Sequence, residues 1–420
     1  MATGPLRRGL TNILKKDPSD IVILSSLRTP ITRSTKGQLS SSYPEQLLHT
    51  VLKATLAANP KLDPSLIDDV CVGVVLSELG GSKAGRMAMN HAGYPATTSF
   101  YTTNRACSSG LQAITNVANS IAMGQVNIGV GGGMESMTRN YASKAIPVDL
   151  WPELKDAERD TRDCIMPMGL TSENVATRYG VGREEQDKFA VESHRRAAHA
   201  QEQGWFDEEI VPVKTRWQEI GKGGVKVGEE KDVVVEKDDG IRKNASLEGM
   251  QKLKPAFKED GTSTAGNSSQ ISDGAAATLM MRRSTATELG LGSSIIGKWA
   301  GSAVAGCRPD EMGIGPALAI PKLLAQTGVT TEEVNIWEIN EAFASQAIYC
   351  VNKLGLMGAY EEGKVNPKGG AIALGHPLGA TGARMVAGLL AELKRRGEEV
   401  GCVSMCIGTG MGMAGLFVRE

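Results

Sequence analysis

Cys107 has the setting of a reactive thiol. It lies in residues 104–110 (Asn-Arg-Ala-Cys-Ser-Ser-Gly), directly before an amphipathic run over residues 111–123. This arrangement predicts a thiol at the N-terminus of a helix, where unpaired backbone N–H groups and the helix dipole favour an anion. Such sites can lower the pKa of a cysteine from about 8.5 toward ~7 or below. We therefore expect Cys107 to be a nucleophile with thiolate character.

A second segment, far along the chain, has the same layout around His376. Residues 375–379 (Gly-His-Pro-Leu-Gly) precede another helical run, residues 383–393, and in both segments a glycine follows the reactive residue three positions later. A helix N-terminus disfavours imidazolium, so we expect His376 to be neutral and able to accept a proton. The two segments predict a nucleophile and a base aimed at one point by a duplicated scaffold.

Two further segments offer groups for carbon–carbon chemistry. Cys406 follows a buried strand pattern and precedes Ile-Gly-Thr-Gly, so its thiol can serve as an acid/base partner for a carbon centre. Gly408 can bring a backbone N–H close to a developing oxyanion, and such donors are worth ~3–4 kcal/mol each. Asn340, just after a predicted strand, can hold a water or a carbonyl. From the residues alone, loop-capping hydrogen bonds account better for Asn340 and Glu341.

The composition excludes several classes of partner. The chain has 420 residues and a net charge of −1, so no global field attracts nucleic acid or a membrane surface. Residues 400–418 form an uncharged run of nearly membrane-spanning length. Glycines, a serine and a threonine interrupt this run, which favours two buried strands joined by a glycine-rich turn over a membrane span.

Cysteine and glycine spacing exclude the common cofactor sites. The chain has seven cysteines, an odd number, which indicates free thiols in a reducing compartment. Cys402 and Cys406 have no histidine or second cysteine pair nearby in the sequence, so we expect no metal. The glycine clusters at 129–133 and 408–415 lack the spacing or the following helix of a dinucleotide site. We expect no cofactor.

The elements that carry these residues occur in two matching sets. Strand, helix, strand, reactive helix and strand follow one another in each half, and the alternation predicts two α/β units, each with a mixed, mostly parallel sheet covered on both faces. A single doubly wound domain with a C-terminal appendage fits the matched landmarks less well. The predicted regions are a basic leader that is an import signal or disordered (1–19), an N-terminal half (20–140, with 269–290 returning to it), a loop domain covering the site (141–268) and a C-terminal half (291–420).

Together these segments resemble the signature blocks of the thiolase family. The four blocks are, in order, residues 104–110 (NRACSSG), 340–343 (NEAF), 370–377 (GAIALGHP) and 406–410 (CIGTG); residues 264–269 (TAGNSS) and 133–137 (GMESM) fit as well. The resemblance runs from about residue 20 to the C-terminus. It implies a duplicated five-layered α-β-α-β-α fold, a homodimer or homotetramer, acyl-CoA and CoA as substrates and no cofactor.

The resemblance also implies a role for each residue. Cys107 would carry the acyl group, His376 would deprotonate Cys107 and the CoA thiol, and Cys406 would exchange a proton with the acetyl-CoA carbanion. The N–H groups of Cys107 and Gly408 would hold one oxyanion, and His376 with a water on Asn340 would hold the enolate oxygen. The substrate-binding positions it implies are Arg242 at the CoA nucleotide, Ser269, Met168 and Phe343 along the pantetheine tunnel, and Ala265.

Within the family the chain is most similar to 3-ketoacyl-CoA thiolases of peroxisomal type. That type implies thiolysis of a 3-ketoacyl-CoA to acetyl-CoA and a shortened acyl-CoA, as in fatty acid β-oxidation. Ala106 departs from a more usual polar residue, and Pro167 stands where short-chain biosynthetic thiolases often carry histidine, which favours longer acyl chains. An acetoacetyl-CoA thiolase, a ketoacyl synthase and a non-catalytic acyl-CoA-binding protein remain as alternatives. The leader lacks the features of a peroxisomal signal, so a mitochondrial location is the alternative to the peroxisomal matrix.

Overall fold

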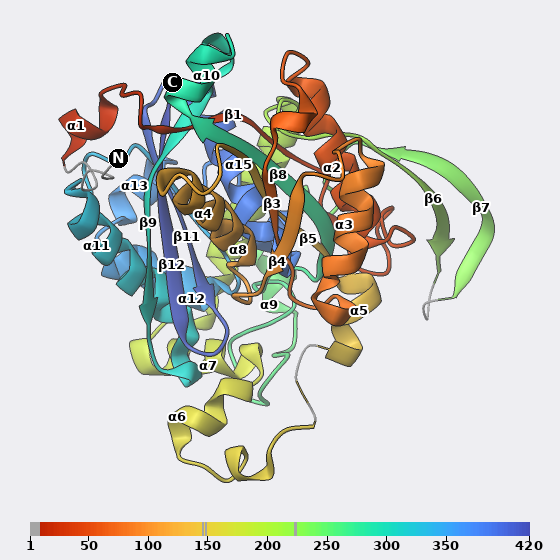
Figure 1. Ribbon diagram of the computed structural model, residues 1–420. Coiled ribbons are helices and arrows are strands. Elements are labelled where there is room, and N and C mark those ends of the chain that lie inside the picture. Colours follow the sequence, from red (N-terminus) through yellow and green to blue (C-terminus); the bar gives the residue numbers. More distant parts are fainter. Residues whose placement is uncertain (1–8, 145–146, 148, 222–224) are drawn as a thin grey trace.

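The structure is a computed structural model that describes residues 9–144, 147, 149–221 and 225–420 (Figure 1). Residues 1–8 of the predicted leader lie outside this part. Helix α1 (Leu10–Leu14) follows them, and its Ile13 is buried in a cluster of C-terminal hydrophobic residues. The ammonium group of Lys298 donates a hydrogen bond to the backbone oxygen of Lys15 at 2.7 Å. The last part of the predicted leader therefore packs on the C-terminal half.

The N-terminal half is built on five main strands. They are β1 (Ile21–Arg28), β3 (Asp69–Gly73), β4 (Ser99–Thr103), β5 (Ile128–Ser136) and β8 (Ser272–Arg282), and the short β2 (Thr32–Arg33) pairs with β8. Their order across the sheet is β4-β3-β5-β8-β1. Strand β3 is parallel to β4 and β5, while β8 is antiparallel to β5 and β1. The chain thus returns to this half after the loop domain, through β8.

The C-terminal half repeats the β3-β5-β8-β1 part of this topology, and no strand named in the described part of the chain is a counterpart of β4. Its strands are β9 (Gly297–Gly306), β10 (Ile336–Ile339), β11 (Val400–Ile407) and β12 (Met411–Arg419), in the order β10-β11-β12-β9. Strand β10 is parallel to β11, and β12 is antiparallel to β11 and β9. The predicted hairpin over residues 400–418 is confirmed, with Val400 opposite Val418.

One detail of the predicted sheets was wrong, and a link between the two sheets was not predicted. Parallel pairing is limited, among the described strands, to β3–β4, β3–β5 and β10–β11, so the sheets are mixed but not mostly parallel. The halves also join in one continuous sheet, because Ile21–Ile23 of β1 pair with Gly297–Trp299 of β9. A buried apolar run does not encode strand direction, which is set by the distant strand that pairs with it.

The helices complete five layers, as predicted. Helices α2 (Pro44–Ala58) and α3 (Ser82–His91) cover the outer face of the N-terminal strands, and α11 (Gly315–Thr327) and α12 (Ala344–Lys353) cover the outer face of the C-terminal strands. Helices α4 (Ser109–Ala122) and α15 (Leu378–Arg396) form the middle layer, where their apolar side chains share one buried cluster with residues of both halves (Figure 1). The shorter helices of the two halves are α10 (Arg283–Glu288), α13 (Met357–Glu361) and α14 (Ala371–Leu374).

The starts of the two central helices touch through glycines. A Cβ atom on Gly110 would lie 2.8 Å from the backbone oxygen of Gly379 and from the amide nitrogen of Ala383. A Cβ atom on Gly379 would lie 2.7 Å from the backbone oxygens of Gly73 and Met134. These distances leave no room for a side chain. The residue three positions after Cys107 therefore packs directly on the residue three positions after His376.

The loop domain lies between the halves in sequence. Helix α5 (Met137–Lys144) leads into it from the N-terminal half. It contains α6 (Arg159–Arg162), α7 (Met168–Tyr179), α8 (Arg183–Glu202), α9 (Leu247–Gln251) and a hairpin of β6 (Val213–Ile220) and β7 (Lys226–Val235). The hairpin projects away from the body of the molecule (Figure 1). Residues 222–224 lie outside the described part.

A buried ion network fastens the loop domain to both halves. Arg28 of β1 is fully buried and donates to Glu209 at 2.7 Å and to Asp238 at 2.8 and 2.9 Å. Lys368 of the C-terminal half binds the other oxygen of Glu209 at 2.7 Å. No helix in the described part of the chain is long and apolar enough to span a lipid bilayer.

Candidate active site

Cys107 sits in a tight loop between β4 and α4. Ala106 adopts a left-handed backbone conformation with φ of 43°, which costs a non-glycine residue about 1–3 kcal/mol. Asn104 and Ser109 hold this conformation: the Asn104 side-chain oxygen accepts the Ala106 N–H at 2.9 Å, and the Ser109 hydroxyl donates to the Ala106 carbonyl at 2.7 Å. The loop therefore stores strain beside the predicted nucleophile.

Cys107 is a neutral thiol in this structure, and the expected thiolate character was wrong. Helix α4 starts two residues later, at Ser109, and the thiol is buried. Burial raises its pKa to about 11, although hydrogen bonds from the N–H groups of Gly408 and of Cys107 itself favour the thiolate; the nearby carboxylate of Glu135 opposes it. The sequence correctly predicted backbone N–H donors at this position, but the effect of desolvation on the pKa is larger than theirs.

His376 has one ring nitrogen free to act as a base. Its Nδ1 lies 2.6 Å from the Thr381 hydroxyl, which donates to the Pro377 carbonyl at 3.0 Å. The hydroxyl proton is thus engaged, so Nδ1 carries the ring proton and donates to Thr381. The other nitrogen, Nε2, is buried and has no hydrogen-bond partner among the described residues. Burial, and then the charge of Arg384, lower the pKa of His376 to about 3, so the predicted neutral imidazole is confirmed.

Cys406 and Asn340 converge on the same region. Cys406 is fully buried near the end of β11, and burial above all raises the pKa of its thiol well above the usual value. The Asn340 N–H binds the carbonyl of Ser404 at 2.9 Å. Both polar atoms of the Asn340 side chain are buried without a partner among the described residues. Orphaned buried polar groups of this kind, on Asn340 and His376, mark the place of a ligand or ordered water.

Three of the predicted substrate-binding residues lie beside these groups. Met168 and Phe343 pack in one apolar cluster with Cys406. The Ser269 N–H donates to the carbonyl of Ala342 at 2.9 Å, which places Ser269 beside the loop that carries Asn340 and Phe343. Arg242 and Ala265 are exposed, Ala265 between buried neighbours, and none of their hydrogen bonds or ion pairs in the described part of the chain reaches Cys107.

The sequence interpretation missed several residues that support the site. Thr381 sets the tautomer of the His376 ring. The backbone oxygen of Gln270 accepts the backbone N–H of His376 at 3.0 Å. The buried carboxylate of Glu135 accepts N–H groups from Val75, Leu76 and Gly379, and its pKa is raised to about 7, by burial above all. A glutamate inside a buried glycine-rich strand was a usable signal for Glu135.

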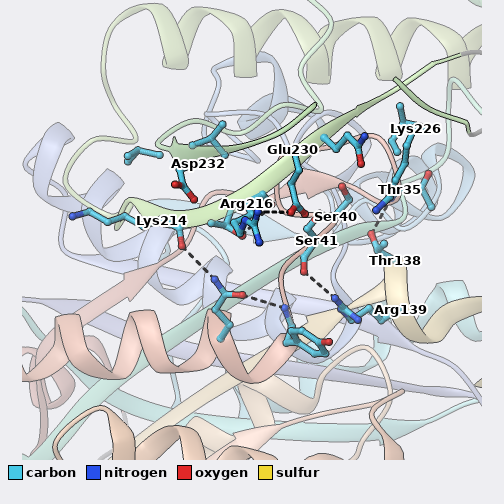
Figure 2. A pocket seen from close by; sticks show the side chains of 17 residues that line it. Thr35, Ser40, Ser41, Thr138, Arg139, Lys214, Arg216, Lys226, Glu230 and Asp232 are labelled. Carbon is cyan, nitrogen blue, oxygen red and sulfur yellow. Dashed lines mark hydrogen bonds and ion pairs between the residues drawn. The ribbon is translucent and has the colours of Figure 1, made fainter. Parts of the chain in front are cut away.

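A cavity of about 1000 Å³ lies elsewhere, under the β6–β7 hairpin (Figure 2). Its lining includes Tyr43, Arg139 and Arg216, and none of the residues from the signature blocks. Arg216 is paired with Glu230 at 2.9 Å, and Arg139 binds backbone carbonyls of Ser41 and Ser42. We do not assign this cavity to the chemistry, because no signature-block residue lines it.

Comparison with known proteins decides the family. Residues 21–284 match the N-terminal domain of thiolases, and residues 293–419 match their C-terminal domain. This chain belongs to the thiolase family. Human peroxisomal 3-ketoacyl-CoA thiolase is 50% identical over 400 residues, covering 95% of this chain and 91% of the human protein. The Arabidopsis thaliana peroxisomal 3-ketoacyl-CoA thiolase 2 is 50% identical over 404 residues, 95% of this chain and 84% of that protein.

Solved thiolases share the fold. The dimeric peroxisomal thiolase of Saccharomyces cerevisiae superposes with a TM-score of 0.88 at 41% identity, covering 98% of this chain and 100% of that one. An acetyl-CoA acetyltransferase of Bacillus anthracis superposes with a TM-score of 0.84 at 35% identity, covering 96% of this chain and 99% of that one.

All seven cysteines of this thiolase are free, as predicted. Within the described residues, no group of three or more His, Cys, Asp or Glu side chains is arranged to hold a metal ion.

Proposed function

We propose that this thiolase cleaves 3-ketoacyl-CoA with CoA, giving acetyl-CoA and an acyl-CoA shortened by two carbons. The proposal is supported by three linked features: the Gly408 N–H bonds the Cys107 sulfur, Gly110 packs on Gly379, and His376 and Asn340 keep buried polar atoms without a partner among the described residues. The relatives with 50% identity are named 3-ketoacyl-CoA thiolases, while the acetyl-CoA acetyltransferase neighbour is 35% identical. This difference favours the degradative substrate over the condensation of two acetyl-CoA molecules.

In the first step Cys107 attacks the keto carbon. The thiol and the imidazole are both neutral before substrate binds, because burial raises the pKa of one and lowers that of the other. The thiol proton therefore moves to Nε2 of His376 as the carbon–sulfur bond forms, rather than before it. The N–H groups of Cys107 and Gly408 already point at the sulfur, so they are placed to stabilise the oxyanion that develops next to it.

Carbon–carbon cleavage then releases acetyl-CoA as an enolate. The enolate oxygen is held by His376 and by a water on Asn340, the two groups whose buried polar atoms lack partners among the described residues. Cys406 donates its proton to the enolate carbon. Its raised pKa suits this role, because a thiol that holds its proton firmly remains available as an acid.

In the second step CoA releases the shortened acyl group. Before this step the proton that His376 took from Cys107 passes to the Cys406 thiolate, so both groups are neutral again. His376 then takes the proton of the CoA thiol, and the resulting thiolate attacks the Cys107 thioester. The Cys107 thiolate that leaves regains a proton from His376 as the shortened acyl-CoA departs. Met168, Phe343 and Ser269 line the pantetheine path, Ala265 adds to its outer wall, and Arg242 contacts the nucleotide. The loop domain, residues 141–268, would thus cover CoA from outside.

The protein acts in the peroxisome, the compartment that the names of its curated relatives give.

We further propose a homodimer joined through β4. The yeast neighbour is also a dimer. Strand β4 ends the sheet, and the exposed side chains of Leu79, Met87 and Tyr101 lie on it or on the elements just before it. Pairing of two β4 strands would cover an open edge that otherwise invites aggregation.

A chain-length series of 3-ketoacyl-CoA substrates tests the function. We expect thiolysis with kcat/KM highest for substrates longer than acetoacetyl-CoA. A preference for acetoacetyl-CoA would instead support the acetyl-CoA-condensing alternative. Binding of acyl-CoA with no turnover of any member would leave only a non-catalytic acyl-CoA-binding protein.

A further inference from the structure

His194 is a buried histidine outside the catalytic centre whose ring nitrogen is aimed at a substrate-binding segment. It lies on α8 with 1% of its surface exposed. Its Nδ1 accepts the backbone N–H of Arg242 at 3.1 Å. Arg242 itself is exposed, and none of the ion pairs among the described residues involves its guanidinium. The histidine thus holds the backbone of a residue whose charged end is left available.

The same segment is fixed on its other side to the catalytic centre. The side-chain amide of Gln270 donates to the carbonyl of Gly240 at 2.9 Å. The backbone oxygen of Gln270 accepts the backbone N–H of His376 at 3.0 Å. Gly240 also lies close to the backbone before His376, because a Cβ atom there would be 2.7 Å from the carbonyl of Ala373. Ile241 packs in the apolar cluster that contains Ala373 and Leu374.

We propose that His194 is a positioning residue for CoA: together with Gln270 it brackets residues 240–242, and so fixes, relative to His376, the backbone from which the Arg242 side chain extends. This inference rests on the proposed role of Arg242 at the CoA nucleotide. A substrate that spans from a reacting thiol to a distant phosphate group binds well only if both ends of the site keep a fixed separation. Gln270 sets this separation near His376, and His194 sets it at Arg242.

The charge state of His194 suits the role. An imidazole accepts a hydrogen bond on Nδ1 only while that nitrogen is unprotonated. Burial, and then the charge of Arg242, lower the pKa of His194 to about 4, so the acceptor is maintained at any working pH.

The test compares CoA with pantetheine, a thiol that lacks the nucleotide. In His194→Phe, which keeps a ring but removes the acceptor, we expect KM for CoA to rise about three- to tenfold, the loss of one backbone hydrogen bond. KM for pantetheine and kcat with either thiol should stay near the parent values. His194→Asn retains an acceptor oxygen near the position of Nδ1, and we expect it to keep KM for CoA near the parent value despite the lost ring.

Arg242→Ala separates this inference from the proposed function. If Arg242→Ala raises KM for CoA and adding His194→Phe raises it no further, the two residues act as one unit, as we infer. The inference is overturned if Arg242→Ala raises KM for CoA and His194→Phe does not. It is also overturned if His194→Phe raises KM for CoA and for pantetheine alike. If His194→Phe fails to fold, His194→Asn decides: a loss of CoA affinity in that variant overturns the inference. An Arg242→Ala enzyme with unchanged KM overturns the nucleotide contact and this inference together, and leaves the thiolysis chemistry standing.

Discussion

Replacing Thr381 by valine should impair catalysis while preserving the shape of the site. Thr381 is fully buried, and its hydroxyl accepts the proton on Nδ1 of His376. Valine has nearly the same shape but leaves that N–H without a partner, which costs about 1–3 kcal/mol. The loss also removes the preference for the tautomer that keeps Nε2 free. At about 1.4 kcal/mol per factor of ten, kcat should fall about 5- to 150-fold.

The assay follows both thiolysis at steady state and the single-turnover acylation of Cys107. Both rates should fall together in Thr381→Val, and KM for the 3-ketoacyl-CoA should change little, because Thr381 acts through the base. Thr381→Ser keeps the hydroxyl and is the matched control, with rates near the parent enzyme. The tautomer argument fails if the valine variant keeps kcat within a factor of two, or if serine is as damaging as valine.

Three further predictions concern the thiols and the ion network. The pKa of Cys107 is about 11, so alkylation of the free enzyme by iodoacetamide should keep accelerating through pH 9; a plateau near pH 8 would show a thiolate that the structure does not support. Cys406→Ser should lower thiolysis more than acyl exchange between Cys107 and CoA, and equal losses would remove its separate role. Glu209→Gln should lower the free energy of unfolding in urea by about 3–5 kcal/mol, because it leaves the buried charge of Arg28 undercompensated. Burial opposes ionisation of Glu209, but Lys368 and Arg28 hold its pKa below the usual value. The stability that the Glu209 carboxylate contributes is therefore present above pH ~4.3 and is lost as the pH falls below it. The unfolding free energies of parent and variant should converge in acid.

Much of the fold could be predicted because it is duplicated. The matching runs around Cys107 and His376 identified two equivalent helices, and the structure places them side by side in the middle layer. The glycines in residues 400–418 favoured a hairpin over a membrane span, and the antiparallel pairing of β11 with β12 confirms the hairpin. These features are local patterns of polarity and backbone freedom, which a sequence carries directly.

The remaining features depend on contacts between distant residues. Strand β7 carries charged side chains on an exposed hairpin, so it lacks the apolar alternation that marks a strand. The direction of β8 is set by its neighbours β1 and β5. The pKa of Cys107 was predicted in the wrong direction because burial depends on the whole fold, whereas the helix start is local. No local pattern marks His194, since its partner Arg242 is 48 positions away.

The central claim is that Cys107 and His376 act on one substrate atom, and trapping the acyl-enzyme tests it most directly. A 3-ketoacyl-CoA added without CoA, followed by rapid acid quenching and peptide mass spectrometry, should place one acyl group on Cys107. The adduct should be absent in Cys107→Ala and should form far more slowly in His376→Ala. An acyl group on another cysteine, or acylation of Cys107 at the parent rate without His376, would contradict the account.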